Sequence, residues 1–304
     1  MDVIDKSILM ALDKNCRMSY EALARDLGVS ANAVRKRVNN LIESNIITDF
    51  VVLFSSAMTG AELLFLQIET DGCEDPEELS ELLGTHPSVL QVTRVASGTG
   101  GLYIVFAEYV DSPQMLELSS YIRSKDCIVS VDTHPLLTSK GGKLELKRVH
   151  LRVLRALTED ARMQISEIAR KSGMTARSAR RALHQMIDSG ALWFATRWDL
   201  AAGGSTRFFA KIQFDEKMTN HQELEDWLTK NYSLVYWYSY VSATEPILFS
   251  NFVVDHISEA DRISRELTRN EFIVSAIPMI VYPTKKYPRI GMTLLEERIK
   301  QEGF

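Results

Sequence analysis

The sequence predicts an α+β protein in which two winged helix-turn-helix domains alternate with two ferredoxin-like modules of βαββαβ order. Two observations lead to this fold class. The chain of 304 residues repeats itself at an offset of 145 residues. Each copy starts with a three-helix pattern and continues with alternating strand and helix patterns. A hydrophobic content of 45% is sufficient for cores of this size.

The repeat is clearest near the start of each copy. Residues 8–47 align without a gap on residues 153–192, and twelve of these forty positions are identical. The identical pairs include Arg17 with Arg162 and Arg35 with Arg180. Since chance similarity would not keep the apolar and polar positions so evenly, the chain holds two copies of one unit.

Each copy begins with three predicted helices. The first two span about residues 5–13 and 20–27 in one copy, and 149–157 and 165–172 in the other. Gly28 and Gly173 end the second helices, because glycine adopts a positive φ most easily. Ser30 and Thr175 should cap the third helices. An apolar strand follows each unit, at 46–54 and 191–198, which favours a winged helix-turn-helix.

The third helices carry the candidate DNA contacts. Their apolar residues recur every three or four positions and predict a buried face, made of Val34, Val38, Leu41 and Ile42 and of Ala179, Leu183, Met186 and Ile187. The other face is polar and basic. Arginine and lysine reach guanine edges or phosphates, and asparagine pairs with adenine, so this chemistry suits the major groove. A single basic face is usually only solvated, but two matching copies favour DNA binding. The candidate DNA-binding residues are Ser30, Asn32, Arg35, Lys36, Asn39, Thr175, Arg177, Arg180, Arg181 and His184.

The charge distribution distinguishes the two copies. The whole chain has a net charge of −5. Residues 1–50 hold 7 Lys and Arg against 7 Asp and Glu, whereas residues 143–197 hold 12 against 5, a net +7; the remainder therefore carries −12. A basic segment within an acidic chain is typical of a nucleic-acid-binding region. We therefore expect the second copy to bind DNA more strongly.

Strand and helix patterns in the order βαββαβ follow each helical unit, over residues 63–137 and 207–282. Asp75 before Pro76, and Ser112 before Pro113, predict helix starts. This order gives a four-stranded antiparallel sheet with two helices on one face. The other face must be covered, most simply by a second such sheet.

The predicted domains are a first helix-turn-helix at 1–57, a first ferredoxin-like module at 58–140, a second helix-turn-helix at 141–202, a second module at 203–284 and a tail at 285–304. Pro283 and Pro288 should break any strand in the tail. A short amphipathic helix is expected near residues 293–301, where it either docks on the body or mediates oligomerisation.

The first helical unit resembles the Lrp/AsnC (leucine-responsive regulatory protein / AsnC) family of transcription regulators. The resemblance implies a DNA-binding third helix joined to a ferredoxin-like module (the RAM domain) that dimerises and senses small molecules. Since family members of ordinary length carry one copy, this chain could form an intramolecular pseudo-dimer with an asymmetric operator. A homodimer is the other arrangement. The matching residues are Asp2, Asp5, Ile8, Leu9, Leu12, the run 15–20, Leu23, Ala24, Gly28, Val29, Ser30, Val34, Arg35, Arg37, Val38 and Leu41.

The resemblance also places an effector pocket near the loop between the second and third strands, where Gly-x-x-Asp is usual. Here the two loops are residues 98–101 and 243–246, and both lack the acidic position, which argues against the usual amino-acid effector. Tyr238 could stack on an aromatic ligand, although cross-strand packing is the simpler role; Tyr236 and Tyr240 should share its face. The candidate effector-binding residues are Gly98, Gly100, Gly101 and Tyr238.

The sequence predicts no catalytic residue, metal site or cofactor. The six histidines lack paired ligand spacing, and no catalytic-triad pattern occurs. Residues 97–101 precede a strand, which disfavours a phosphate loop, and the RNP1 pattern of RNA-binding modules is absent. Three scattered cysteines, Cys16, Cys73 and Cys127, are expected to be buried thiols. An enzymatic alternative is a siroheme decarboxylase-like protein, because those enzymes share this two-part architecture.

The sequence also predicts a location. No window approaches the roughly 18 consecutive apolar residues of a membrane span, and the first residues lack the features of a signal peptide. We therefore expect a cytoplasmic protein whose main partner is double-stranded DNA.

Overall fold

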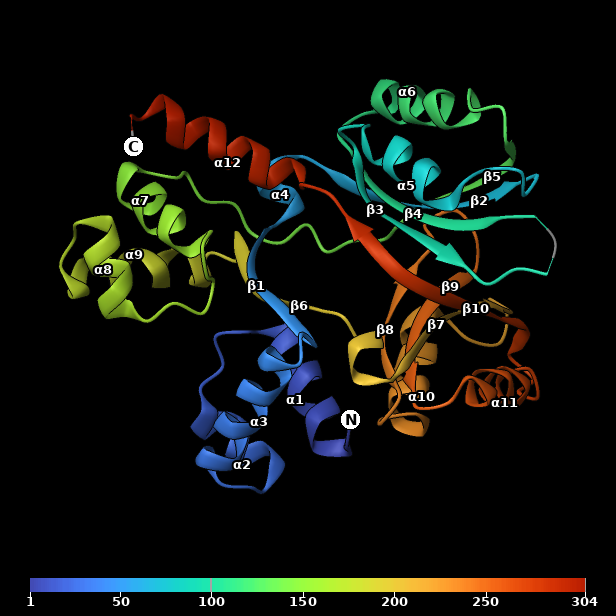
Figure 1. Cartoon of the computed structure of the whole chain (residues 1–304), viewed down its shortest axis with the longest axis horizontal. Helices are drawn as coiled ribbons and strands as arrows, with labels where there is room; N and C mark the ends of the chain where they lie inside the picture. The colour runs from blue at the N-terminus through green and yellow to red at the C-terminus, as the bar shows by residue number, and fades with distance from the viewer. Residues whose placement is uncertain (99, 304) are drawn as a thin grey trace. The chain divides into compact units, whose positions relative to one another are not determined.

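The computed structural model in Figure 1 describes residues 1–98 and 100–303. The chain divides into two compact units. Unit 1 consists of Met1–Gly60, Ser139–Gly203 and the stretch from Ile290 onward, and unit 2 consists of Ala61–Thr138 and Gly204–Arg289. Both helical repeats lie in unit 1 and both βαββαβ segments lie in unit 2. The predicted α+β class is confirmed.

The helices of unit 1 follow the predicted pattern. Both second helices end at a glycine with positive φ, 67° at Gly28 and 62° at Gly173. The hydroxyl of Ser30 accepts a hydrogen bond from the Ala33 amide, and that of Thr175 accepts one from the Ser178 amide, both at 3.2 Å. The caps of the third helices are therefore confirmed. The helices are α1 (Val3–Lys14), α2 (Tyr20–Leu27) and α3 (Ala31–Glu43) in the first copy, and α7 (Arg148–Leu157), α8 (Ile165–Ser172) and α9 (Ala176–Asp188) in the second.

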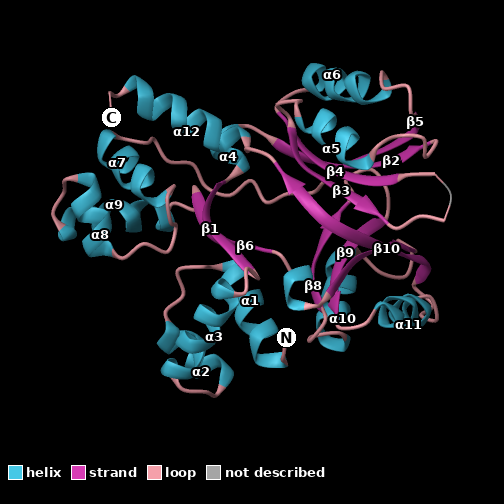
Figure 2. Cartoon of the chain, in the orientation of Figure 1, coloured by secondary structure: helices cyan, strands magenta, loops and turns pink. Residues whose placement is uncertain are grey.

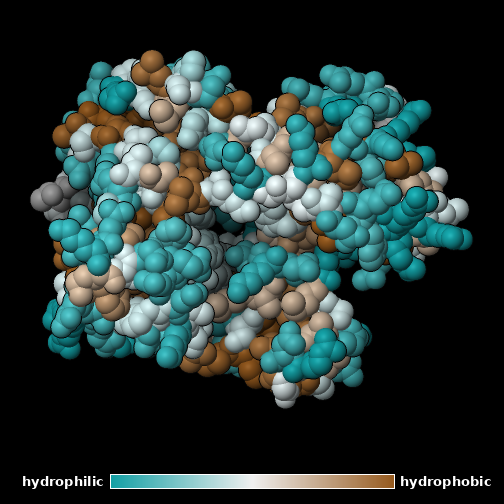
Figure 3. Space-filling view, turned by 180° about the vertical axis from the view of Figure 1, so that it is seen from behind, coloured by the Kyte–Doolittle hydropathy of each residue, from teal (hydrophilic) through white to brown (hydrophobic). Residues whose placement is uncertain are grey.

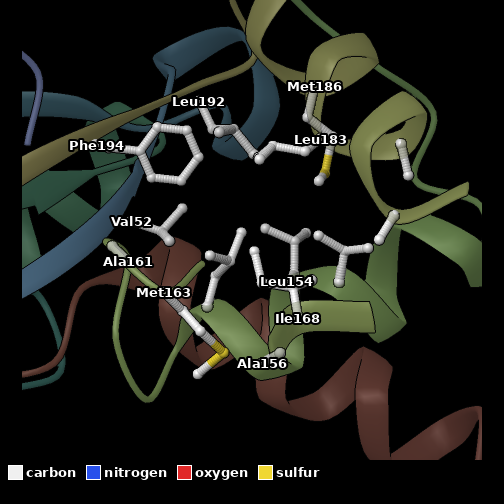
Figure 4. Close-up of a cluster of buried hydrophobic side chains, with 14 of the residues drawn as sticks. Val52, Leu154, Ala156, Ala161, Met163, Ile168, Leu183, Met186, Leu192 and Phe194 are labelled. Atoms are coloured by element: carbon white, nitrogen blue, oxygen red, sulfur yellow. The ribbon is translucent and has the colours of Figure 1, made fainter. Parts of the chain in front are cut away.

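The strands that follow the helical units pair with each other. Strand β1 (Ile47–Phe54) runs antiparallel to β6 (Leu192–Trp198). Each copy therefore shares its strand with the other copy. Beneath this ribbon lies a buried apolar cluster, in which Val52 of β1 and Phe194 of β6 point toward Leu154 and Ile168 of the second copy (Figure 4). The two copies are joined through this core.

Two repeated arginines also join the copies. Arg17 donates hydrogen bonds to the backbone carbonyls of Ala161 and Met163, the latter at 3.0 Å. Arg162 donates to the carbonyl of Cys16. Each arginine thus supports the turn between the first two helices of the other copy. This reciprocal contact gives a structural reason for the identity of the two residues.

The end of the chain packs on unit 1. Helix α12 (Ile290–Gln301) places Leu295 and Ile299 in the same buried cluster as Val52 and Phe194, with 3% and 8% of their surfaces exposed. Of the two roles expected for the tail, docking on the body is the one observed. Shorter helical turns occur at α4 (Ser56–Thr59) and η1 (Ala201–Gly203).

Unit 2 contains the two βαββαβ segments, whose strands and helices are distinguished by colour in Figure 2. In the described part of the chain they form one eight-stranded antiparallel sheet in the order β5-β2-β4-β3-β10-β7-β9-β8. The elements are β2 (Glu62–Thr70), α5 (Pro76–Gly84), β3 (Val89–Val95), β4 (Leu102–Tyr109), α6 (Ser112–Arg123), β5 (Ile128–Pro135), β7 (Thr206–Phe214), α10 (His221–Asn231), β8 (Tyr236–Val241), β9 (Ile247–Val254), α11 (Ile257–Leu267) and β10 (Ile273–Lys286).

The sheet closes on itself as a barrel. A bridge between Leu136 and Ser242 joins the ends of the edge strands β5 and β8. The inner faces of the two halves meet in an aromatic core, where the rings of Phe65 and Phe249 stack with centroids 3.7 Å apart. The outer faces pack under the helices in separate clusters. One half of the sheet covers the other, as the sequence analysis expected.

Strand β10 contradicts the expected effect of Pro283. The strand continues through this proline to Lys286. Its first part pairs with β7, and its last part pairs with β3, with a register shift between Val281 and Thr284. Proline is tolerated at such an irregularity because no ladder hydrogen bond is lost there. This long strand is what links the two halves of the sheet.

The predicted helix start at Ser112 is confirmed, because α6 begins at this residue; its N-cap is Asp111, whose carboxylate accepts a hydrogen bond from the Gln114 amide at 2.9 Å. The prediction for the cysteines was wrong. The cysteines are not all buried: Cys16 is buried, Cys73 is exposed and Cys127 is intermediate. Cys73 lies in a loop, where sequence periodicity gives no signal of burial.

The surface is largely hydrophilic on the face drawn in Figure 3, with apolar patches between the polar side chains. Within the described residues, no helix has both the length and the apolar character needed to cross a bilayer.

Candidate nucleic-acid interface

Helix α3 presents its predicted polar face to solvent. The side chains of Asn32, Arg35, Lys36 and Asn39 are exposed, and so is the capping Ser30. On the opposite face, the buried residues are Val34, Val38 and Leu41. The capped N-terminus adds the positive end of the helix dipole, which favours phosphate. All five predicted residues of this copy are therefore accessible on one helix.

Helix α9 repeats this arrangement. The exposed residues include Arg177, Arg180, Arg181 and His184, together with the capping Thr175. The buried residues are Ala179, Ala182, Leu183 and Met186. The two helices therefore hold equivalent residues in equivalent positions, as the offset of 145 residues predicts.

The prediction that Ile42 and Ile187 are buried was wrong. Ile42 and its equivalent Ile187 are 40% and 41% exposed. Both lie in the last turn of their helices, beside the edge of the buried stripe. Apolar spacing of three and four residues assigns Ile42 and Ile187 to the buried face. It does not show whether a neighbouring helix extends far enough to cover them.

The basic residues of α3 and α9 divide into two groups, according to whether they pair with a carboxylate of the same chain. Within residues 1–98 and 100–303, Lys36, Arg177, Arg180 and Arg181 form no ion pair with a carboxylate. Arg35 lies over the ring of Tyr20, with 5.6 Å between the guanidinium carbon and the ring centroid. These guanidinium and ammonium groups are available to an anionic partner.

Arg37 belongs to the second group. Its guanidinium contacts the carboxylates of Asp2 and Asp5, both at 2.7 Å, and so ties α3 to the start of α1. The pKa of Asp2 is lowered chiefly by the hydrogen bond from the Asp5 amide, with a further contribution from Arg37. Arg37 has a structural role, and position 182 in the second copy is alanine.

The glycine loop of the first module packs tightly on its own chain. The Gly101 amide donates to the Thr70 hydroxyl at 3.0 Å. A Cβ atom at Gly101 would lie 2.1 Å from the Glu74 carboxylate, and one at Gly100, where φ is +67°, would lie 2.4 Å from the Thr70 carbonyl. Glycine is therefore needed at these two positions, because a Cβ atom there would collide with Glu74 or Thr70. Gly98 is exposed with open space around it, and Thr99 lies outside the described residues.

Tyr238 lies in the other module, and the described structure does not bring it to the glycine loop. Its ring meets that of Tyr240 edge-on, with centroids 5.4 Å apart. The expectation that Tyr236 shares their face was wrong. The register of β8 shifts between Tyr236 and Tyr238, so Tyr236 joins the helix-side core while Tyr240 joins the barrel core. A bulge of this kind cannot be read from simple alternation.

A further polar cluster was missed by the sequence analysis. Asp132, His134 and Glu245 lie together in unit 2, with one potential ligand atom of each within 4.8 Å of the others. Glu245 is more than a hundred residues from the other two, and the fold brings it near. Motif spacing therefore carried no signal of this cluster.

Two family models match the helical repeats. The model of the AsnC-type helix-turn-helix domain matches residues 1–42. A model described as winged helix-turn-helix DNA-binding matches residues 146–192. The two matches cover the two copies identified from the internal repeat.

Several known proteins are similar to this chain. The uncharacterized HTH-type transcriptional regulator PF1231 of Pyrococcus furiosus is 32% identical over 106 residues, covering 31% of this chain and 72% of that protein. Regulatory protein AsnC of Haemophilus influenzae is 28% identical over 126 residues, covering 41% of this chain and 81% of that protein. Among solved structures, the siroheme decarboxylase NirDL aligns over 100% of both chains, with a TM-score of 0.56 and 12% identity. At this identity the likeness shows a shared fold alone.

Proposed function

The chain belongs to the Lrp/AsnC family of DNA-binding transcriptional regulators, and from this premise we propose that both of its third helices, α3 and α9, read the major groove of double-stranded DNA. The observation that carries the proposal is the pair of exposed basic faces that repeat at the same helical positions. Guanidinium and amide groups on such a face pair with base edges and phosphates. The ten predicted residues are the proposed contacts. A cytoplasmic location follows from this partner.

The two helices proposed to read DNA, α3 and α9, differ in sequence at the exposed positions. Position 32 is asparagine where position 177 is arginine, and position 39 is asparagine where position 184 is histidine. Asparagine pairs well with adenine, while arginine pairs well with guanine. We therefore propose an operator whose two half-sites differ in sequence.

The affinity of paired variants tests this function. The full chain is first used to select duplexes from a random pool, and fluorescence anisotropy at fixed salt then measures binding to the selected duplex. We expect Arg180→Ala with Arg181→Ala to weaken binding more than Arg35→Ala with Lys36→Ala, because the second copy is more basic. Each double variant should lose about tenfold or more, at ~1–3 kcal/mol per specific contact.

The control for this experiment lies on α11. Arg262 and Arg265 are exposed on this helix of unit 2 and pair with acidic residues four positions away. Their double alanine variant removes the same charge and should bind almost as tightly as the unmodified chain. Equal losses in the control and in both helix-turn-helix variants would show that only overall charge matters, and would contradict groove reading.

We also propose that one chain acts as a pseudo-dimer. The pairing of β1 with β6 and the shared barrel core support this, because they join the two copies within one molecule. Two such chains can also associate into a larger assembly without disturbing the pseudo-dimer. Both loops lack the acidic residue of the family's Gly-x-x-Asp pattern, so we propose that an amino acid does not bind there.

We propose that the chain is a regulator without enzymatic activity. The alternative is a siroheme decarboxylase-like enzyme, because NirDL shares this fold over the full length of both chains, although at 12% identity the likeness concerns the fold alone. The two functions are separated by incubating the purified chain with an iron uroporphyrin. We expect no tetrapyrrole absorbance to remain with the protein after gel filtration. Retained tetrapyrrole at one per chain would support the enzyme instead.

A further inference from the structure

The cluster of Asp132, His134 and Glu245 lies where the barrel closes. Asp132 and His134 are on β5, and Glu245 is in the loop between β8 and β9. In the described chain, this seam is held by the bridge between Leu136 and Ser242 and by backbone hydrogen bonds such as that from the Ala243 amide to the Pro135 carbonyl at 2.7 Å. The three side chains therefore come from both sides of a lightly hydrogen-bonded seam, two from β5 and one from the loop after β8.

The imidazole of His134 is fully buried and held at both nitrogens. Its Nδ1 lies 3.1 Å from the Ser242 hydroxyl, and its Nε2 lies 3.0 Å from the Asp132 carboxylate. The Ser242 hydroxyl also accepts hydrogen bonds from the Thr244 and Glu245 amides at 3.3 Å. A hydrogen bond that fixes one imidazole nitrogen, while the other faces a possible ligand site, is the arrangement found around metal-bound histidines.

Asp132 already forms an ion pair with Lys211. The ammonium of Lys211 lies 2.9 Å from the same carboxylate oxygen that faces His134. The carboxylate of Asp132 therefore lies where it holds positive charge.

The duplication shows that the fold does not require these residues. At the offset of 145, the equivalents of Asp132, His134 and Glu245 are Ile277, Met279 and Gly100. The equivalent seam, between β3 and β10, forms without any titratable group at these positions. The buried histidine beside a carboxylate thus has no counterpart at the equivalent positions of the other seam, and closing the sheet does not explain it.

We propose that Asp132, His134 and Glu245 bind one divalent transition-metal ion, with Zn²⁺ as the best match. One imidazole nitrogen and two carboxylate oxygens are ligands that Zn²⁺ accepts, whereas Mg²⁺ and Ca²⁺ prefer oxygen alone. Tetrahedral zinc with bonds of about 2.1 Å needs ligand atoms about 3.4 Å apart. The potential ligand atoms lie within 4.8 Å of one another, so binding requires the exposed Glu245 side chain to move its carboxylate closer to the other two.

Binding would displace the Lys211 ammonium and clamp the two barrel halves together. The site would keep one position for water, because three protein side chains ligate the ion. A ligand that binds only the folded chain raises its stability. The inference does not depend on DNA binding, since all its residues lie in unit 2.

A zinc titration of the metal-free full chain tests the proposal. A chromophoric chelator that competes for Zn²⁺ reports affinity and stoichiometry, and thermal unfolding reports stability. We expect one Zn²⁺ per chain and a rise in Tm of about 3 °C or more at saturating Zn²⁺, with no rise for equimolar Mg²⁺. Glu245→Gln should weaken binding at least tenfold. Because Glu245 is exposed, this variant should fold normally.

Two further variants sharpen the test. Lys211→Met should strengthen zinc binding, since the competing ammonium is removed. Glu69→Gln is the matched control: Glu69 is an exposed carboxylate on β2, whose partner is Ser130, outside the cluster. It should bind Zn²⁺ like the unmodified chain. The proposal is overturned if Glu245→Gln and Glu69→Gln bind equally, or if Zn²⁺ leaves Tm unchanged.

Discussion

At the level of single residues, the arginines of the helical repeats show what sequence can and cannot reveal. The exposure of Arg35 and Arg180 was predictable, because helical spacing assigns each residue to a face. The role of Arg17 was not predictable. Its hydrogen-bond partners are carbonyls in the other copy, 144 and 146 residues away, and no local pattern encodes such a pairing.

The first prediction separates structural from DNA-contacting arginines. Arg17→Ala leaves the carbonyls of Ala161 and Met163 without their donor, so we expect the free energy of unfolding to fall by about 1–3 kcal/mol. Arg180→Ala removes an exposed side chain without an ion-pair partner in the described chain, and should change stability by less than ~0.5 kcal/mol. Urea unfolding followed by circular dichroism measures both. A larger loss of stability for Arg180→Ala would contradict the assignment.

A second prediction concerns the cysteines. Burial raises the pKa of the Cys16 thiol to about 12, although Arg162 and Arg17 oppose this. The thiol is therefore protonated at pH 8 and shielded from reagents, and we expect iodoacetamide to modify exposed Cys73 first and Cys16 only after unfolding. Peptide mass spectrometry checks the order. Early labelling of Cys16 in the folded chain would show that the core around it is open.

The same pKa has a consequence for stability. The ordinary pKa of the thiol is 9.0, so the unfolded chain releases this proton at lower pH than the folded chain does. Its contribution to stability is complete below pH 9 and is lost as the pH rises from 9 toward 12.

At the level of helices and strands, local signals were reliable and long-range pairings were not. The caps at Ser30 and Thr175 and the glycine ends of the second helices depend on neighbouring residues only, and the sequence predicted them. The pairing of β1 with β6 and the division of β10 between two partner strands depend on tertiary structure. Pro283 was misread for this reason, because its effect depends on the register of its neighbours.

A third prediction belongs to α12. Leu295 is 3% exposed within the core of unit 1, whereas the adjacent Leu294 is 46% exposed. Leu295→Ala should lower the free energy of unfolding by about 2–5 kcal/mol, because it opens a cavity. Leu294→Ala, the matched control on the same helix, should change it by less than ~1 kcal/mol. Similar effects of the two variants in urea unfolding would show that the tail does not pack as described.

At the level of the whole molecule, duplication explains both the symmetry and its exceptions. The repeat predicted two readers, two modules and a sheet that covers another sheet. It could not predict the differences between equivalent places, such as the polar cluster at one seam and Met279 at the other. Such differences are free to arise once both halves belong to one chain, because each half can change without its partner.

The salt dependence of DNA binding shows whether both third helices contact the DNA backbone. Each cation that neutralises a phosphate contributes about 0.9 to the slope of log K against log salt concentration. On the selected duplex, we predict that Arg35→Ala with Lys36→Ala and Arg180→Ala with Arg181→Ala each reduce this slope by about 1–2, while the α11 control leaves it unchanged. If neither helix-turn-helix variant changes the slope, neither third helix contacts the DNA backbone, and the account of two readers in one chain is wrong.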